Sequence, residues 1–577
     1  MKRLNLPKVW GQGILFAYSG MEGENTAAQS LVGTLLGDCI GMEFKTPTRA
    51  FLTLDLDGVT DLDYHIISSD WIEAVLTDAG GKEYLLDILF VKQNVVAIRT
   101  SQLTKTKLFF KNALPASNTD GIMVYDDGEK QFAYGEKVTG DVVLGVFAYA
   151  QDAACLVKDG FHIDINQKIE EKTKFYQSLP VPAFQDADEE MVYYKCFSVM
   201  KSMLYTPEGR IHTMWSTPDR YPHKNMWLWD TAFHSVGIKY ISPTLAEHAL
   251  RAMISVQAED GFIPHMATPE KNSHITQPPT LAWAILELHK YSPNKQLLMD
   301  VFDHLAAYLT WDMKNRDLNN NGLLEWVVEN EARCRCGESG MDNTPRFDEA
   351  TEMDCIDFSA FFANDVRCLV KIAKIIGRDQ DARYWQGVYD KVKDAINEVL
   401  WDDEDKFYYD RKLSDGKLHK VKTVASFLPL FAGVCDAEKA KALVEHLNNP
   451  DEFNTAFPIP TVSKDDKTYP TGDMFRGNVW INFNYLIGKG LQEYGFSEEA
   501  EKLYEKTIET IKYWYMNDGV VYEYYDSRAK VRPARLSRKG HAVQPYLPDI
   551  RVQSIRDFSW GCVFLPDMLF DIRKNNA

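Results

Sequence analysis

The chain has 577 residues, of which 45% are hydrophobic and 25% are charged, a composition typical of soluble globular proteins and a length sufficient for two domains. Its formal net charge of −19 argues against nucleic acid and anionic membrane surfaces as partners, because both repel an acidic protein. The nine cysteines are scattered and no apolar run reaches about 18 residues, so we predict a cytoplasmic protein with reduced thiols and no membrane span.

Residues 1–160 show the pattern of short β-strands. Leu52, Leu54 and Leu56 alternate with polar residues, as in a strand with one buried face. Hairpin turns are predicted at residues 78–81 and 127–128, because Asp and Gly separate apolar runs there. Short, regularly spaced strands predict an antiparallel β-sandwich domain. The charged residues 161–186 are then predicted to form a linker helix.

From residue 187 to 577 the apolar pattern becomes helical, with a period close to 3.6 residues. Phe358, Phe361, Phe362 and Val366, for example, fall on one helix face. The predicted helices lie near residues 187–204, 230–240, 243–258, 277–291, 295–315, 356–376, 380–400, 421–432, 437–448, 478–494, 498–516 and 558–573.

The connections between these helices alternate between short turns and long loops. The long loops are predicted at residues 205–229, 259–276, 316–355, 401–420, 449–477 and 517–557. If consecutive helices run antiparallel, every long loop emerges at the same end. The sequence therefore predicts a mainly α catalytic domain, an (α/α)6 barrel with a loop-lined pocket at one end. A helical solenoid would also pair its helices, but the sequence has no repeat of fixed period.

Two of the long loops contain an acidic segment, one around Asp342 and one around Glu523. Inverting glycosidases use one carboxylic acid to protonate the leaving oxygen and one carboxylate to activate water, and the two groups are about 6.5–9.5 Å apart. We expect Glu338 and Asp348, which flank Asp342 in sequence, to raise its pKa as like charges do. The alternative for both segments is a solvated surface loop.

Aromatic and charged residues recur where the even-numbered helices begin, at the same end as the acidic loops. Singly, each Trp could be a core anchor, and Asp230 could be a helix cap. Together they fit a site that stacks on a sugar ring and hydrogen-bonds its hydroxyl groups. The candidate substrate-binding residues are Trp227, Trp229, Asp230, Phe233, Gln277, Asn343, Arg346, Phe475, Arg476, Gly477, Trp480 and Trp560.

The ordered segments WLWD, GFIPH, QPP, ESGMDN, FRGNVW, YEYYD and FSW resemble glycoside hydrolase family 63 and its relatives, which include α-glucosidases, mannosylglycerate and glucosylglycerate hydrolases and, more distantly, trehalase. The resemblance covers residues 187–577. It implies Asp342 as the general acid and Glu523 as the general base, with no cofactor. The sugar-subsite residues that it implies are Trp229, Asp230, Gln277, Arg476 and Trp480. Phe475 stands where many relatives carry Trp.

The predicted function is an inverting, exo-acting α-glycosidase for a small soluble carbohydrate, with an α-glucoside preferred. Glycoside phosphorylases share this architecture but replace the base by a phosphate site, so Glu523 separates the two classes. Sugar epimerases use the same toroid with paired histidines, but the histidines of this chain are not concentrated in these loops. A non-catalytic carbohydrate-binding relative would lack one of the two carboxyl groups. No oligomeric state is predicted.

Two segments resemble metal sites. Residues 317–322 begin like a calcium-binding loop, but the twelfth position is Val328 instead of an acidic residue, so a turn is favoured and an irregular calcium site near Asp317 stays as the alternative. Cys334 and Cys336 form the one close cysteine pair, and two thiols do not complete a zinc site. No metal is predicted.

Overall fold

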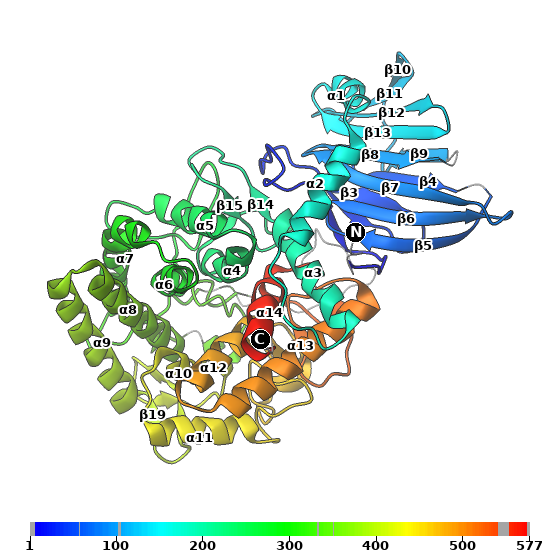
Figure 1. Cartoon of the computed structure of the whole chain (residues 1–577). Helices are drawn as coiled ribbons and strands as arrows, with labels where there is room; N and C mark the ends of the chain where they lie inside the picture. Colours follow the sequence, from blue (N-terminus) through cyan, green and yellow to red (C-terminus); the bar gives the residue numbers. More distant parts are fainter. Residues whose placement is uncertain are drawn as a thin grey trace.

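The computed structural model describes residues 6–56, 58–101, 105–329, 331, 334–349, 351–539 and 553–573. Residues 1–5 of the predicted β-domain and 574–577 of the predicted helical domain lie outside them. A region of β-strands (blue to cyan in Figure 1) comes first, and helices follow to the C-terminus. In the described parts of the chain, no helix combines the length and the apolar character that a membrane crossing requires.

The N-terminal region consists of two antiparallel sheets. The smaller sheet has the order β1-β2-β3-β4-β9 and the larger one β10-β11-β12-β13-β8-β7-β6-β5. Their bounds are β1 Leu15–Ala17, β2 Val32–Leu35, β3 Gly41–Phe44, β4 Ala50–Asp55, β5 Val59–Ile67, β6 Trp71–Asp78, β7 Glu83–Lys92, β8 Val95–Thr100, β9 Lys105–Phe110, β10 Ala116–Thr119, β11 Ile122–Asp126, β12 Gln131–Thr139 and β13 Val142–Ala150.

The strand pattern of the sequence is confirmed at several places. Leu52 and Leu54 are buried on β4, and Thr53 between them is more exposed. Leu56, the third leucine of the predicted alternation, is half-buried and lies just beyond the strand. The predicted turns join β6 to β7 and β11 to β12 as antiparallel hairpins. The sheets share one hydrophobic core, in which Phe44 of the smaller sheet stacks on Phe147 of the larger, with ring centroids 4.6 Å apart.

Helices α1 (Ala153–Gly160) and α2 (Ile165–Gln177) follow the sheets, and α2 lies within the predicted linker. The remaining helices are α3 Ala187–Ser202, α4 Leu228–Ile241, α5 Pro243–Ser255, α6 Leu281–Tyr291, α7 Lys295–Arg316, α8 Ile356–Ile376, α9 Asp379–Val399, α10 Leu428–Ala432, α11 Ala437–Asn448, α12 Ile481–Glu493, α13 Ser497–Asp518 and α14 Ser559–Ile572. They correspond to the predicted helices within a few residues, except for α10.

Helix α10 is shorter than predicted. The 3₁₀ turn η2 (Val424–Phe427) precedes it, and Pro429 occupies its first turn. A proline is favoured in the first turn of a helix, where its missing N–H has no intrahelical partner to lose, and is costly in the interior, so its position fits a late start of the α-helical part. Gly433, which has a φ of 67°, then ends the helix in the left-handed conformation that favours glycine.

Between the helices lie short strands and 3₁₀ turns, most of them in the long loops. Their bounds are β14 Leu204–Tyr205, β15 Trp215–Ser216, β16 Met226–Trp227, β17 Met266–Ala267, β18 Met353–Asp354, β19 Trp401–Asp402, β20 Phe407–Tyr408, β21 Asp410–Lys412, β22 Leu418–His419, β23 Asn478–Val479, β24 Tyr525–Asp526, η1 Pro345–Phe347, η3 Tyr469–Thr471 and η4 Pro533–Arg535.

The even-numbered helices from α4 onward contact one another in a closed sequence: α4 with α6, α6 with α8, α8 with α10, α10 with α12, α12 with α14, and α14 with α4. The odd-numbered helices α5, α9 and α13 pack against α4, α8 and α12. Figure 1 shows α14 in the middle of the helical region and α9 and α11 at its periphery.

Asp365 shows how these contacts fix the start of a helix. It lies on α8, and its carboxylate accepts hydrogen bonds of 2.9 Å from the backbone N–H groups of Ala282 and Trp283 in the first turn of α6. The residue that precedes α6, Thr280, makes no side-chain cap. A neighbouring helix therefore satisfies the free N–H groups of α6 and places the loop before it, which contains Gln277.

Candidate active site

The long loops enclose a cavity of about 290 Å³. It is lined by Pro218, His223, Trp227, Trp229, Asp230, His265, Ile275, Gln277, Glu329, Cys334, Gly337, Gly340, Asp342, Met474, Trp480, Glu523, Arg538, Lys539, Phe558 and Trp560. The predicted acid and base, Asp342 and Glu523, are thus in the lining of one cavity, together with predicted sugar-binding residues from the starts of α4, α6, α12 and α14.

Asp342 lies in the loop between α7 and α8, which packs directly on Trp229 at the start of α4. Gly340 has a φ of 68°, and a Cβ atom there would be 2.3 Å from Cζ2 of Trp229. Only a glycine combines this backbone conformation with such a close approach to the ring. The backbone N–H of Arg335 donates to the carbonyl oxygen of Asp342 over 3.0 Å, which fixes the turn that presents its side chain.

Glu523 precedes β24, which pairs with β23 at the start of α12. Its side chain is 2% exposed. Arg538 donates to both carboxylate oxygens, from Nε to Oε2 and from Nη2 to Oε1, each over 3.1 Å. The backbone N–H of Ile555 adds a bond of 3.2 Å to Oε2. A planar guanidinium that donates to both oxygens fixes the plane of the carboxylate.

Asp342 also has a cationic partner, because Nζ of Lys539 lies 2.5 Å from its Oδ2. Glu338 and Asp348, the two like charges expected beside Asp342, both have arginine partners. Glu338 is buried and bonded to Arg316, with Nη2 2.6 Å from Oε1. Asp348 pairs with Arg476. Each flanking carboxylate is therefore balanced by an arginine of its own.

Asp230 is the third carboxyl group of the cavity. Burial raises its pKa to about 7, although a hydrogen bond of 2.8 Å from Nε1 of Trp560 acts in the opposite direction. Trp229 meets Trp560 edge to face, with ring centroids 5.0 Å apart. Gln277 accepts a bond of 3.3 Å from the backbone N–H of Trp229. A protonated carboxyl group between indole rings can both donate to and accept from a sugar hydroxyl group.

Several predicted substrate-binding residues lie behind the cavity instead of in its lining. Phe233 packs on Trp229, and Phe475 stacks on Trp480 with centroids 4.1 Å apart. The residues outside the lining are Phe233, Asn343, Arg346, Phe475, Arg476 and Gly477.

Some of these residues join the acidic loop to the loop before α12. Asn343 accepts a bond of 3.0 Å from the backbone N–H of Phe475 and donates over 3.2 Å to the carbonyl oxygen of Asp473. Arg476 donates from Nε to the carbonyl oxygen of Asn343 over 2.8 Å. These bonds to backbone, together with the ion pair from Arg476 to Asp348, hold the loop that carries Asp342.

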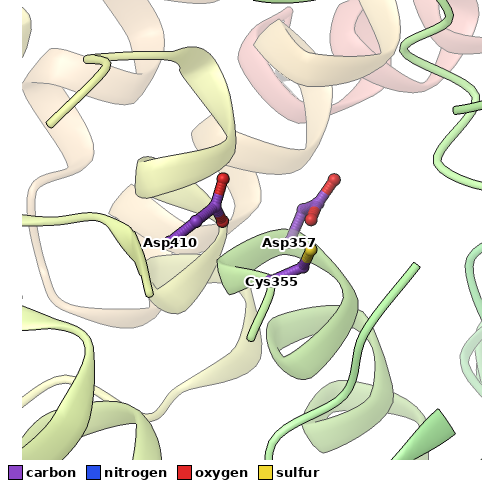
Figure 2. Close-up of side chains that lie close together, drawn as sticks. All are labelled: Cys355, Asp357 and Asp410. Atoms are coloured by element: carbon purple, nitrogen blue, oxygen red, sulfur yellow. The ribbon is translucent and has the colours of Figure 1, made fainter. Parts of the chain in front are cut away.

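Arg346 belongs to a buried ionic cluster, which it contacts through its two Nη atoms. Cys355, Asp357 and Asp410 lie close enough together to hold a metal ion, and Figure 2 shows the carboxyl groups of Asp357 and Asp410 near the sulfur of Cys355. Arg346 donates to Asp357 and, over 3.1 Å, to both oxygens of Asp410. The guanidinium supplies the positive charge that these buried carboxylates require, so the cluster fits an arginine better than a metal ion.

The calcium-like segment forms a turn. Both carboxylate oxygens of Asp317 accept backbone N–H groups, from Asn321 over 2.9 Å and from Gly322 over 3.0 Å. The side chains of Asn319 and Asn321 donate to Asp354. Asn319 and Asn321 each form an Asx turn within this segment, because their Oδ1 atoms accept the backbone N–H groups of Asn321 over 3.0 Å and Leu323 over 2.8 Å.

Sequence reasoning missed the polar groups that surround the two carboxyl groups. Arg538 and Lys539 follow Glu523 in the same long loop, and their signal is a pair of consecutive cations after an acidic segment. His265 belongs to the GFIPH segment; burial lowers its pKa to about 4 and its Nδ1 lies 2.5 Å from Oγ of Ser273. His223 is bonded to Asp219 over 2.6 Å.

A cavity lined by four indole rings and by loop-borne carboxyl groups, among them Asp342 and Glu523, is typical of one class of protein, the glycoside hydrolases. Residues 221–530 match the model of the mannosylglycerate hydrolase MGH1-like glycoside hydrolase domain. The chain belongs to this family, and it is a glycoside hydrolase.

Individual proteins extend this comparison. The chain is 25% identical to mannosylglycerate hydrolase MGH1 of Selaginella moellendorffii, over 53% of this chain and 75% of that protein. A family 63 mannosylglycerate hydrolase from Thermus thermophilus, solved with glucose, has a TM-score of 0.53 at 23% identity, over 65% of this chain and 99% of that one. A bacterial glucoamylase solved with acarbose has a TM-score of 0.57 at 13% identity, over 99% of both chains. At these identities the structural likeness concerns the fold.

Proposed function

We propose that this glycoside hydrolase is an inverting, exo-acting α-glycosidase in which Asp342 is the general acid and Glu523 the general base. The observation that supports this assignment is their common position in the lining of one cavity. Asp342 donates its proton to the glycosidic oxygen as the bond from that oxygen to the anomeric carbon breaks. Glu523 accepts a proton from the water molecule that forms the new bond to the anomeric carbon.

The architecture proposed for this activity is an (α/α)6 barrel. The closed sequence of contacts from α4 to α14 fits its inner layer, and the odd-numbered helices fit its outer layer. We assign residues 187–577 to this catalytic domain, residues 161–186 to a linker helix and residues 1–160 to a β-sandwich domain. Long loops at one end of the barrel would then form the cavity.

The sugar subsite is assigned to Trp229, Asp230, Gln277 and Trp560, with Trp480 beside them. Trp227 adds a hydrogen-bond donor, because its indole Nε1 is buried without a partner among the described residues. Indole rings stack on the apolar faces of a pyranose, and carboxyl and amide groups bond its hydroxyl groups. A cavity of about 290 Å³ suits one or two small units, which favours an exo-acting enzyme on a small glycoside.

The substrate proposal combines the predicted α-glucoside with the names of the relatives. The curated relatives described above are named mannosylglycerate hydrolases, so glucosyl and mannosyl glycerates are the first substrates to examine. All nine cysteines are free, which supports a cytoplasmic location.

The test is hydrolysis of a panel of α-linked disaccharides and glycosyl glycerates, followed by proton NMR. Inversion releases the β-anomer from an α-glycoside before mutarotation. Release of the α-anomer would contradict inversion and the role of Glu523. A sugar phosphate that forms only when inorganic phosphate is present would instead identify a glycoside phosphorylase, the alternative on the same architecture.

A further inference from the structure

Two consecutive residues contact the two carboxyl groups of the site, one each. Arg538 is bonded to Glu523, and Lys539 to Asp342. Both cations line the cavity. Their environments differ, because the side chain of Arg538 is 7% exposed and that of Lys539 is 24% exposed. Arg538 is bonded to both carboxylate oxygens of Glu523, whereas Lys539 has a flexible stem and, among the described residues, one ion pair, to an oxygen of Asp342.

The contact of Lys539 conflicts with the role proposed for Asp342. A general acid must carry a proton and must approach the glycosidic oxygen to within hydrogen-bond distance. In the structure, Nζ of Lys539 lies 2.5 Å from Oδ2 of Asp342. Lys539 must therefore move away from this oxygen before Asp342 can donate a proton, and its charge then needs another acceptor.

The position of Lys539 indicates where that acceptor comes from. Asp342 protonates the oxygen that links the sugar to the aglycone, so a group bonded to Asp342 lies on the aglycone side of the site. Two of the other acidic side chains in the lining, Glu523 and Asp230, already have partners in Arg538 and Trp560. The third, Glu329, is the acceptor within the protein that the experiment has to distinguish from a substrate. His265 does not compete for an anion at neutral pH, because burial lowers its pKa to about 4.

We propose that Lys539 determines the aglycone specificity: it is bonded to Asp342 in the empty site and moves to a carboxylate of the aglycone when substrate binds. This inference rests on the proposed function. The anionic aglycone then has two effects. It binds to an ammonium group, and it frees Asp342 for proton donation. A glycoside with a neutral aglycone supplies no such acceptor, and Lys539 stays on the acid.

The experiment uses two matched substrates, α-glucosylglycerate and α-glucosylglycerol, which differ in one carboxylate. We expect the wild-type enzyme to prefer the glycerate by kcat/KM. Lys539→Met should lower kcat/KM for the glycerate roughly tenfold to a hundredfold, the usual range for a lost bond to a charged group. The same variant should leave the glycerol substrate unchanged or faster, because Asp342 is then unoccupied.

Two further variants serve as controls. Arg535→Met removes an exposed cation from the same segment and should leave the ratio of the two kcat/KM values unchanged. Lys539→Arg keeps the charge and should keep part of the preference. An equal loss on both substrates with Lys539→Met would overturn the inference, and so would an unchanged ratio. If the ammonium group instead moved to a protein side chain such as Glu329, which also lines the cavity, Lys539→Met would change kcat/KM equally for the two substrates.

Binding of D-glycerate, measured by calorimetric titration, separates this inference from the proposed function. The wild-type protein should bind D-glycerate more tightly than Lys539→Met does, and the two proteins should have the same affinity for glycerol. If the wild-type protein binds D-glycerate through Lys539 but hydrolyses no glycoside, the proposed function is wrong and the anion site stands. If it hydrolyses glycosides but Lys539→Met binds D-glycerate equally well, the inference is wrong and the function stands.

Discussion

Asp342, Glu523 and Asp230 line one cavity in three different surroundings. Asp342 contacts an ammonium group, Glu523 a guanidinium and a backbone N–H, and Asp230 an indole N–H. Acid and base catalysis in one site requires carboxyl groups whose environments differ, because otherwise they would titrate alike. The identity of the partner, more than that of the carboxyl group, separates their roles.

Replacement of the proposed acid should show its effect through the leaving group. Asp342→Asn cannot donate a proton, so hydrolysis of a substrate with an alkyl leaving group should fall roughly 10²- to 10⁴-fold. The nitrophenolate group of a nitrophenyl glycoside leaves without protonation, so the hydrolysis of that substrate should fall much less. Steady-state kinetics on both substrates provide the measurement. A similar loss on the two substrates would transfer the acid role to another residue, with Glu338 the next candidate in sequence.

Asp230 links the site to stability through its pKa of about 7, which burial raises from 3.8. Between these two values the unfolded chain ionises at this residue and the folded protein does not, so wild-type stability falls as pH rises toward 7. Asp230→Asn removes this loss. Its melting temperature relative to the wild type should therefore be higher at pH 8 than at pH 5, while activity falls.

Thermal melts at the two pH values test this prediction, and the bond from Trp560 is retained because an amide oxygen can still accept it. A melting-temperature difference that is the same at pH 5 and pH 8 would mean that Asp230 is ionised in the folded protein at both values. A larger difference at pH 5 would contradict the sign of the pKa shift.

At the scale of elements, helices were predictable because each repeats a buried face. Phe358, Phe361 and Phe362 on α8 are all buried, as their spacing requires. The alternation of short and long connections also placed Asp342 and Glu523 in one cavity. Helix α10 was overestimated because its apolar run continues through a 3₁₀ turn, and an apolar pattern does not separate these two conformations.

The partners within the loops were not predictable in the same way. Arg346 and Arg476 were expected to bind sugar, but they are bonded to Asp410 and Asp348. An arginine forms the same bidentate bond to a substrate or to a neighbouring loop, and residue type alone does not choose between them. Lys539 was missed for the same reason, because its partner Asp342 is about 200 residues away along the chain and only folding brings them together.

The contact between the acidic loop and α4 gives a prediction at this scale. Gly340→Ala would place a methyl group 2.3 Å from Cζ2 of Trp229, at a φ of 68°. We expect the loop and the Trp229 ring to separate, so kcat/KM should fall at least tenfold, since misplacement of about 1 Å can cost 100-fold. Steady-state kinetics and intrinsic fluorescence measure the effect.

Gly387→Ala provides the matched control. Gly387 lies on the exposed side of α9, and a Cβ atom there meets nothing within 4 Å. Alanine is the better helix former by about 0.5–1 kcal/mol, so this variant should be slightly more stable than the wild type and equally active. Equal activity in Gly340→Ala would show that Trp229 tolerates the methyl group and that the loop is looser than its geometry indicates.

At the scale of the whole molecule, buried ion pairs join the β-region to the helices. Asp70, in the turn before β6, contacts Lys172 on α2 and Lys201 on α3, each over 2.7 Å. A second junction lies closer to the site. Asp557 accepts the backbone N–H of Leu15 on β1 over 2.9 Å and contacts Lys195 on α3 over 2.9 Å. The first strand therefore supports the segment whose Ile555 donates a backbone N–H to Glu523, the proposed base.

These junctions imply that the β-region and the helices do not unfold independently. Lys172 and Lys201 depend on Asp70 of the β-region, and a buried lysine that loses its carboxylate partners is strongly destabilising. The β-region thereby acts on the catalytic loops through structure, although none of its strands contributes a residue to the cavity lining. A protein built this way should melt in one transition that is sensitive to the shared carboxylates.

Asp70→Asn tests this coupling. The variant leaves Lys172 and Lys201 buried, with side chains 0% and 2% exposed, and with Glu22 as their remaining carboxylate. We therefore expect the unfolding free energy at pH 7 to fall by less than the roughly 3–5 kcal/mol typical of a buried charge left without any partner. Burial raises the pKa of Asp70, but the two lysines more than offset this and hold it below its usual range. The stability that Asp70 contributes is therefore present above about pH 4 and is lost as the pH falls further.

The difference in unfolding free energy between Asp70→Asn and the wild type should accordingly become smaller at acidic pH. Asp55→Asn is the matched control, because Asp55 on β4 pairs with Lys107 at the surface, with side chains 41% and 61% exposed, and a surface pair contributes about 0–1 kcal/mol. At temperatures where Asp70→Asn stays folded, its kcat/KM should match the wild type, since Asp70 lies outside the cavity lining. Two separate transitions in the melt of Asp70→Asn, with the helical one unshifted, would show that the regions unfold independently.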